Sequence, residues 1–344
     1  MREQLAVLLF SFGVAWLATR FVLCLAAPLG LIQAPNHRSS HVKPTATGGG
    51  VGMVVAITLV AGWFAVMQSE PLYPLLLGLL LATLGLWDDM GHVPAGLRFG
   101  VQLLVVGVFL LLVGVLPAWD FPGLGVLQGW PLLLVLLVAG VWWVNLFNFM
   151  DGIDGLAGVQ GLSMLAVAAG LLVWVEPAVR SEVLWLFILC IAAAILGFLA
   201  MNWPPAKIFM GDVGSTWLSF IIFTVALLTI QRGWLSYGCW LVLASVFVID
   251  ASITLFTRLI RGERWYEAHR SHAYQHLARR WQGDQKAGHR KVTLLVMVIN
   301  VLWLAPWAVI VLKIPAYTWA WLVAAWTPIV AAVLYLKAGQ SEKH

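Results

Sequence analysis

The chain has 344 residues, of which 62% are hydrophobic and only 10% are charged, and its mean hydropathy is +0.92. This composition excludes an ordinary soluble globular protein, whose surface requires more charged residues. The formal net charge is +5, but the basic residues lie in short loops and form no separate basic domain, which argues against a nucleic-acid-binding protein.

Apolar runs bounded by glycine, proline or charge recur along the whole chain, and each is long enough to cross a membrane. They predict an all-α, polytopic helical bundle with about eleven spans of ~20 residues each. The predicted spans are 5–27, 49–68, 72–87, 98–117, 131–148, 158–176, 183–203, 214–231, 235–259, 291–312 and 318–337. No linker or internal repeat divides them, so we expect one transmembrane domain over residues 1–344. Cys24, Cys190 and Cys239 lie in apolar runs and are expected to act as small hydrophobic residues.

Five polar segments interrupt the apolar background, over residues 36–50, 88–89, 145–154, 207–215 and 261–291. Polar side chains are costly next to hydrocarbon, so their recurrence at the ends of apolar runs predicts one shared polar site.

Basic residues in the loops predict the orientation, because they accumulate on the cytoplasmic face. With about eleven spans the termini lie on opposite faces. One orientation leaves only Arg2, Arg180, Arg232 and Lys313 outside and places nearly all other basic residues on the side of the C-terminus. We therefore predict an external N-terminus, a cytoplasmic C-terminus and a polar site on the cytoplasmic face. The basic loops there also attract anionic membrane lipids.

The first polar segment combines basic, amide and hydroxyl side chains with glycines that open an apolar span. Its candidate substrate-binding residues are Asn36, Arg38, His41, Lys43 and Thr45. The glycine run 48–50 can bring backbone N–H groups to an anion, and it can equally serve as a helix-packing or hinge element.

Asp88 and Asp89 end the third span. Adjacent residues on a helix point about 100° apart, so the two carboxylates cannot chelate one ion symmetrically. One carboxylate can face the site while its neighbour binds or orients another group. Oxygen ligands of this kind suit Mg²⁺, which takes one or two carboxylates and leaves other positions to water and phosphate. A solvated helix end is the alternative interpretation.

Asn145, Asn148, Asp151 and Asp154 recur every three residues, so they form one polar stripe for as long as the chain is helical. Packing explains such a cluster at a membrane boundary poorly. The pattern indicates a functional site at the end of the fifth span.

Asp212 lies where the eighth span begins, flanked by Gly211 and Gly214. A helix N-terminus attracts anions, and a carboxylate there is well placed to hold a metal that bridges phosphate oxygens. Lys207 lies nearby as a candidate phosphate contact, and Ser215 can cap the helix.

The last polar segment holds Arg270, His272 and His276. The spacing of the two histidines brings them together on a helix. Phosphate or sugar contact is favoured over zinc, because the segment contains no cysteine and no carboxylate lies between the two histidines.

As an ordered set, these motifs resemble the polyprenyl-phosphate N-acetylhexosamine-1-phosphate transferases. The resemblance runs from about Pro35 to Arg280. It comprises Asp-Asp after the third span, Asn-x-x-Asn-x-x-Asp-Gly-x-Asp-Gly, Phe-Met-Gly-Asp-x-Gly-Ser and a late histidine-containing loop. The segment from Pro44 to Gly50 resembles the family's Pro-Thr-Pro-x-Gly-Gly, and Arg98 with Gln102 resembles the pair that follows its Asp-Asp.

The resemblance implies transfer of an N-acetylated amino-sugar-1-phosphate from a UDP-linked sugar to undecaprenyl phosphate, with release of UMP. It also implies a bacterial inner-membrane protein, Mg²⁺ or Mn²⁺ as cofactor, and leaves a homodimer open. The implied catalytic residues are Asp88, Asp89, Asp151, Asp154 and Asp212, with the metal on Asp212, Asp88 and Asp89. The implied substrate-binding residues are Asn36, Arg38, His41, Lys43, Thr45, Arg98, Asn145, Asn148, Lys207, Arg270, His272 and His276.

One motif departs from the family pattern. The family's late motif is usually His-x-His-His, whereas here His272 is followed by Ala273, Tyr274 and Gln275. The departure argues against the peptidoglycan enzyme and favours the O-antigen branch of the family, with the same phosphotransfer in peptidoglycan or teichoic-acid synthesis as an alternative. Direct in-line attack is the expected mechanism, with a covalent phospho-aspartate intermediate as the second alternative. A polytopic lipid or ion transporter is the competing class.

Overall fold

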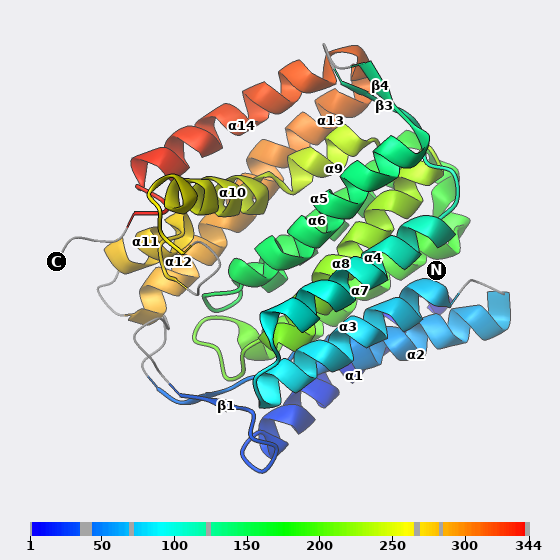
Figure 1. Cartoon of the computed structure of the whole chain (residues 1–344). Helices are drawn as coiled ribbons and strands as arrows, with labels where there is room; N and C mark the ends of the chain where they lie inside the picture. Colours follow the sequence, from blue (N-terminus) through cyan, green and yellow to red (C-terminus); the bar gives the residue numbers. More distant parts are fainter. Residues whose placement is uncertain are drawn as a thin grey trace.

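A computed structural model describes residues 2–34, 43–68, 72–121, 125–264, 269–281 and 285–340. Helices make up nearly all of the regular structure (Figure 1). The helices are α1 (Arg2–Leu25), α2 (Val51–Gln68), α3 (Tyr73–Met90), α4 (Ala95–Leu112), α5 (Gly129–Phe149), α6 (Leu156–Val175), α7 (Val183–Asn202), α8 (Gly211–Gln231), α9 (Tyr237–Leu243), α10 (Ser245–Ile260), α11 (Ala273–Arg280), α12 (Gln285–Val298), α13 (Ala305–Lys313) and α14 (Thr318–Tyr335). A π-helical segment (Ile299–Leu304) joins α12 to α13, and 3₁₀ turns cover Pro177–Ser181 and Pro315–Tyr317.

Two short antiparallel pairs supply the described strands. Strand β1 (Ile32–Gln33) pairs with β2 (Thr45–Ala46), and β3 (Trp119–Phe121) pairs with β4 (Gly125–Leu127). Ala46 also forms a parallel bridge with Ile208, so the segment before α2 lies beside the segment before α8.

Each of the predicted spans has a counterpart among the described helices, which confirms a polytopic helical membrane protein. Among the described residues nine helices are long and apolar enough to cross a membrane, and counting α9 with α10 as one span brings the number to 10. Helix α2 is apolar but shorter over its described part, Val51–Val66.

The predicted span 235–259 corresponds to two helices, because α9 and α10 meet at an angle of 73°. Buried amide groups satisfy the backbone at this break. The Gln160 side chain donates to the Leu243 carbonyl (3.1 Å) and accepts a hydrogen bond from Asn300 (2.8 Å). A carbonyl freed by a bend in an apolar region needs such a partner. No glycine or proline marks the break, so the local sequence gives no signal for it.

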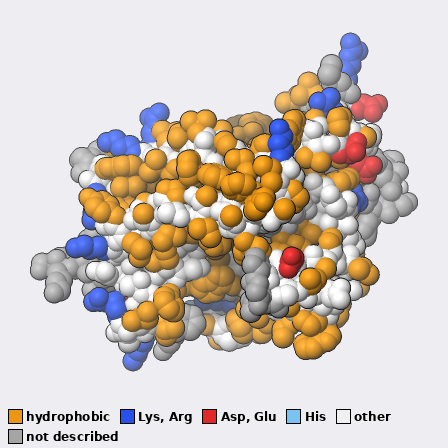
Figure 2. Space-filling model, turned by 90° about the horizontal axis from the view of Figure 1, so that it is seen from above, with side chains coloured by type: hydrophobic (Ala, Val, Ile, Leu, Met, Phe, Trp, Pro, Cys, Tyr) orange, Lys and Arg blue, Asp and Glu red, His pale blue; other side chains and the backbone are white. Residues whose placement is uncertain are grey.

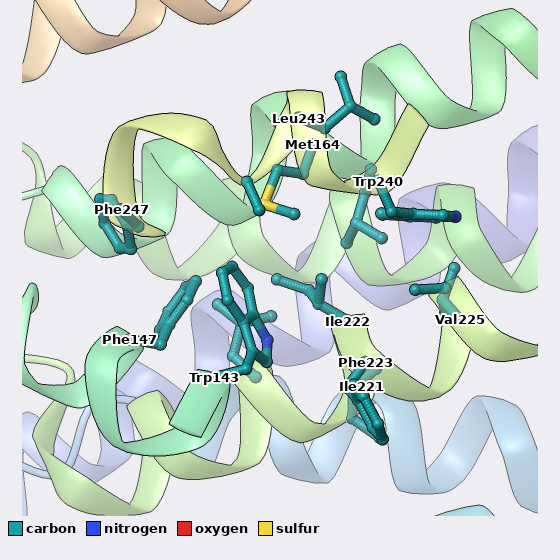
Figure 3. Close-up of a cluster of buried hydrophobic side chains, with 14 of the residues drawn as sticks. Trp143, Phe147, Met164, Ile221, Ile222, Phe223, Val225, Trp240, Leu243 and Phe247 are labelled. Carbon is teal, nitrogen blue, oxygen red and sulfur yellow. The ribbon is translucent and has the colours of Figure 1, made fainter. Parts of the chain in front are cut away.

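Helix α8 forms the centre of the bundle. In an 18-residue window of α8, 83% of the residues are buried inside the protein. In the corresponding window of Pro315–Tyr335 the buried share is 17%, so α14 lies at the periphery. Figure 3 shows aromatic and aliphatic side chains of α5, α6, α8, α9 and α10 packed together around Ile222 and Trp143. Phe147 contacts Trp143 and Phe247, with ring centroids 5.4 and 5.1 Å apart. This packing fixes α5 and α10 relative to each other.

The polar segments gather at one end of the bundle. The turns between α5 and α6 and between α7 and α8, together with β1 and α11, all lie toward the left in Figure 1. Figure 2 shows a broad hydrophobic middle, with Lys and Arg side chains crowded at the same left end. The start of α1 and the end of α14 lie at opposite ends, as an odd number of crossings requires.

We expect this polar end to face the cytoplasm. Lys313 and Arg290 are exposed at opposite ends of the span Ala287–Lys313. In a Cys24→Ser background, the cysteine of Lys313→Cys should react with an impermeant thiol reagent added to intact cells, whereas that of Arg290→Cys should react only after permeabilisation. Cys190 and Cys239 are buried and can remain. The opposite labelling pattern would contradict the predicted orientation.

Candidate active site

Asp88 and Asp212 converge on the guanidinium group of Arg98. Nη1 of Arg98 contacts Oδ2 of Asp88 closely and lies 3.1 Å from Oδ2 of Asp212. Oδ1 of Asp88 also accepts a hydrogen bond from the Val93 backbone (2.9 Å), which fixes this carboxylate at the turn between α3 and α4. Three helices, α3, α4 and α8, therefore place two carboxylates and one cation at a single point.

The neighbouring carboxylate, Asp89, caps helix α8. Its Oδ1 accepts a hydrogen bond from the Asp212 N–H (2.9 Å) and its Oδ2 accepts one from the Val213 N–H (3.1 Å). The two N–H groups belong to the first turn of α8, where backbone donors lack partners within the helix. As expected for adjacent residues, Asp88 and Asp89 point to different groups.

The prediction that Ser215 caps α8 is wrong, because its hydroxyl lies inside the helix and donates to the Gly211 carbonyl (3.2 Å).

Asn148 connects helix α5 to the same site. Its Nδ2 donates to Oδ1 of Asp212 (2.9 Å) and contacts the hydroxyl of Ser215 (2.8 Å). Asn145 lies one turn earlier and donates to the side chain of Gln102 on α4 (2.7 Å). Asn148 thus orients a site carboxylate, whereas Asn145 ties α5 to α4.

The glycine run before α2 serves for packing. The N–H groups of Gly49 and Gly50 donate to the carbonyls of Phe209 and Met210, each at 2.9 Å. A Cβ at position 50 would overlap the backbone of Gly214. These glycines let the start of α2 lie against the start of α8, and the N–H groups of Gly49 and Gly50 are already engaged.

The predicted polar stripe is broken after Phe149, where α5 ends, so Asp151 and Asp154 lie in the turn before α6. Burial raises the pKa of the Asp151 carboxyl well above its usual range, and the neighbouring Asp212, Asp89 and Asp154 add to the rise. The Asp154 carboxylate contacts a different group of residues. It accepts from the Ala206 N–H (3.0 Å) and lies 3.4 Å from Nδ1 of His289.

The late polar segment is organised by Asp250, which is absent from the predicted site residues. Its oxygens accept hydrogen bonds from the backbone N–H groups of Ala273 (2.9 Å) and Tyr274 (3.0 Å) at the start of α11. Oδ1 also lies 3.4 Å from Nδ1 of His272. The signal available in the sequence is a lone carboxylate within the apolar run 235–259.

The other basic groups of this segment differ in their environment. His276 is buried, and its Nδ1 lies 3.3 Å from Nη2 of Arg279, whereas Arg270 is exposed. Burial, together with nearby His272 and Arg258, lowers the pKa of His269 to about 3, so this ring is neutral at physiological pH.

The remaining predicted residues lie at the margin or outside the described part. Lys43 and Lys207 are exposed, and the Thr45 hydroxyl donates to the Lys43 carbonyl (3.0 Å). Asn36, Arg38 and His41 lie outside the described residues.

The site residues fit a magnesium ion. Asp88 and Asp212 each place an oxygen on the same Arg98 nitrogen, so the two carboxylates already converge on one cationic group. Within the described ranges, no group of three or more His, Cys, Asp and Glu side chains has a metal-holding arrangement. Mg²⁺ usually takes only one or two carboxylates and completes its shell with water and phosphate oxygens. The pair therefore suits a metal that is bound together with a phosphorylated substrate.

Comparisons with known proteins identify the family. The model of glycosyl transferase family 4 matches residues 71–230, the part of the chain that contributes Asp88, Asp89, Arg98, Asn148 and Asp212. A decaprenyl-phosphate N-acetylglucosaminephosphotransferase of Mycobacterium tuberculosis is 30% identical over 338 residues, covering 86% of this chain and 80% of the relative.

Two further relatives are similar over most of their length. A probable undecaprenyl-phosphate N-acetylglucosaminyl 1-phosphate transferase of Bacillus subtilis is 28% identical over 293 residues, covering 80% of this chain and 78% of the relative. An undecaprenyl-phosphate alpha-N-acetylglucosaminyl 1-phosphate transferase of Salmonella typhimurium is 27% identical over 314 residues, covering 87% and 82%. The chain therefore belongs to glycosyl transferase family 4, as a membrane-embedded phosphotransferase of the polyprenyl-phosphate N-acetylhexosamine-1-phosphate transferase type.

Proposed function

We propose that this protein transfers N-acetylglucosamine-1-phosphate from UDP-N-acetylglucosamine to undecaprenyl phosphate and releases UMP. The reaction would take place at the cytoplasmic face of the bacterial inner membrane and would initiate O-antigen or a related surface polysaccharide. The activities for which the three relatives are named support the sugar phosphate and the polyprenyl acceptor. The observation that carries the proposal is the convergence of Asp88 and Asp212 on Arg98 at the polar end of the bundle.

The chemistry joins two anions, so neutralisation of charge is the main requirement. An oxygen of the acceptor phosphate attacks the β-phosphorus of the donor and forms the new P–O bond. The bond from that phosphorus to the oxygen bridging it to UMP breaks, and UMP leaves with the electron pair. The acceptor phosphate is already ionised near neutral pH, so no general base is required.

Different residues of the site would neutralise charge and hold the site in place. Asp88 and Asp212 would hold Mg²⁺, for which Mn²⁺ can substitute, and the ion supplies positive charge to the pyrophosphate when bound. Arg98 offsets further negative charge, and Asn148 holds Asp212 in its rotamer through the hydrogen bond to Oδ1. Asp89 keeps the start of α8 in place. Attack by an aspartate oxygen, giving a phospho-aspartate, is the second alternative.

An apolar cavity of about 190 Å³ suits the hydrocarbon chain of the acceptor. It lies between α5, α8, α9 and α10, and its lining includes Leu136, Trp143, Leu146, Phe223 and Trp240. Figure 3 shows Trp143, Phe223 and Trp240 around this region. Its lining runs from Trp119 on β3 to Leu146, which follows Asn145 on α5, so the cavity lies along the apolar middle of the bundle.

The broken span α9–α10 raises a transporter as the second candidate, because ion sites in transporters often lie in broken helices. Asp250 is the carboxylate within that span. Its two oxygens, however, accept hydrogen bonds from Ala273, Tyr274 and the Thr254 hydroxyl (3.1 Å), so the carboxylate is engaged in holding α11.

The direct test uses purified protein in detergent with undecaprenyl phosphate, UDP-N-acetylglucosamine and Mg²⁺. We expect equimolar UMP and a radiolabelled lipid-linked sugar diphosphate, both abolished by EDTA and restored by Mg²⁺. UDP-N-acetylgalactosamine and UDP-N-acetylmuramoyl-pentapeptide serve as competing donors. Asp120→Asn, on β3 at the other end of the molecule, is the control variant. Absence of UMP with every donor, together with ion flux in liposomes, would favour the transporter.

A further inference from the structure

The ring of Tyr274 lies against the turn that follows helix α5. Its hydroxyl donates to the Phe149 carbonyl (3.1 Å), the last residue of α5. A Cβ at Gly152 would overlap that hydroxyl oxygen and lie 3.0 Å from Nε2 of Gln275. The φ of Gly152 is not in the left-handed region, so glycine is required here for room and not for backbone conformation. Tyr274 and Gly152 are therefore a sterically matched pair.

Helix α11 holds Tyr274 in this place. Asp250 on α10 is only 3% exposed, and its carboxylate accepts hydrogen bonds from the backbone N–H groups of Ala273 and Tyr274 at the start of α11. The ring of His272 stacks near that of Tyr274, with centroids 5.6 Å apart and planes inclined by 22°. The side chain of Tyr274 thus projects from a rigid support, and little movement is left to it.

The turn that Tyr274 contacts carries Asp151. The Asp151 N–H donates to the Asn148 carbonyl (3.1 Å), and the Asn148 side chain donates in turn to Asp212 (2.9 Å), while Tyr274 contacts the same turn at Phe149 and Gly152. The turn therefore lies between the carboxylate site and α11. Tyr274 and Gln275 are also the two positions at which the chain departs from the family's histidine motif.

We propose that Tyr274, supported by Asp250, is a positioning residue that holds the turn of Gly152 and thereby keeps the Asp151 carboxyl directed at the phosphate site. The proposal rests on the proposed phosphotransfer. The hydroxyl acts by contact with the backbone of the turn, and neither Tyr274 nor Asp250 needs to touch substrate. A displacement of about 1 Å at the turn is enough to lower the rate of a positioned reaction about a hundredfold.

A double-mutant cycle between the two partners tests the proposal. Gly152→Ala should lower kcat about a hundredfold, because the new methyl group displaces the turn from Tyr274. Tyr274→Phe removes the hydroxyl and should lower kcat about fivefold, with KM for both substrates within about twofold of the wild type. The double variant Gly152→Ala/Tyr274→Phe gains room for the methyl group. The added Cβ would then lie 3.2 Å from Cζ of residue 274 and 3.0 Å from Nε2 of Gln275, so kcat should recover most of the way to that of Tyr274→Phe alone, a strongly non-additive result.

Hydrogen exchange of residues 150–155 provides a readout that does not require turnover. Exchange should rise in Gly152→Ala and in Tyr274→Phe, fall back in the double variant relative to Gly152→Ala, and stay constant in α8. If the wild-type protein proves inactive, the proposed function fails while the exchange cycle still tests the contact.

Two variants serve as matched controls. Gly170→Ala adds a methyl group where no atom lies within 4 Å, and Tyr317→Phe removes an exposed hydroxyl in the turn before α14. Both should leave kcat and exchange unchanged. A double variant whose kcat equals the product of the two single effects would overturn the proposal. Unchanged kcat and exchange in Tyr274→Phe would do the same.

Discussion

Replacement of Asp212 by asparagine is expected to lower turnover about a thousandfold while folded protein is still recovered in detergent. The substitution removes the charge that faces Arg98, and the amide is a poor ligand for Mg²⁺. The hydrogen bond from Asn148 to Oδ1 can persist, and Asp89 still caps the backbone N–H of residue 212. The measurement is release of UMP at saturating substrates over a series of Mg²⁺ concentrations.

Asp120→Asn is the matched control for this substitution, because it removes an exposed carboxylate at the opposite end of the bundle. It should retain full activity. Near-normal turnover of Asp212→Asn at limiting Mg²⁺ would remove Asp212 from the metal site and leave Asp88 as its only described carboxylate.

Asp88→Asn and Asp89→Asn should both be damaging, but for different reasons. Asp88 shares Arg98 with Asp212, so its loss should raise the Mg²⁺ concentration for half-maximal activity about tenfold or more. Asp89 holds two backbone N–H groups at the start of α8. Asparagine keeps one of the two acceptor oxygens and places an NH2 group against the other N–H, so one hydrogen bond is lost. We expect kcat to fall and the apparent Tm to drop by about 2 °C, the effect of about 1 kcal/mol.

The Mg²⁺ titration separates the two roles. The half-maximal Mg²⁺ concentration of Asp89→Asn should stay within about twofold of the wild type, because its effect is on the position of Asp212. A shift as large as that of Asp88→Asn would mean that Asp89 is itself a ligand, and the assignment of Asp89 as a helix cap alone would be wrong.

The sequence predicts those parts of the molecule that depend on local periodicity. The spans follow from hydropathy, and the divergence of Asp88 and Asp89 follows from the angle between neighbours on a helix. The meeting of polar segments at one end of the bundle follows from their common position at span ends. These features require no knowledge of which helices are neighbours.

The features that the sequence does not predict depend on contacts between distant positions. The Asp89 cap joins residues 123 apart, and the contact from Tyr274 to Phe149 joins residues 125 apart. The bend after Leu243 depends on an amide of α6 and on Asn300 in the π-helical segment. Asp151 and Asp154 leave the polar stripe because α5 ends at Phe149, close to the predicted span end at 148, and their spacing alone does not give their partners beyond that point. No local pattern encodes these partners.

The long reach of the Asp89 cap has a consequence for biosynthesis. Asp88 meets Arg98 only 10 residues later, so this ion pair can form as soon as α4 is made. The hydrogen-bond partners of Asp89 exist only once α8 has been made. At ~5–20 residues per second the intervening 123 residues take roughly 6–25 s to translate. Through that interval the end of α3 has to keep Asp89 in contact with water. The two adjacent carboxylates therefore acquire their partners at different times, and a nascent chain that stops before Gly211 can anchor in the membrane but cannot complete the site.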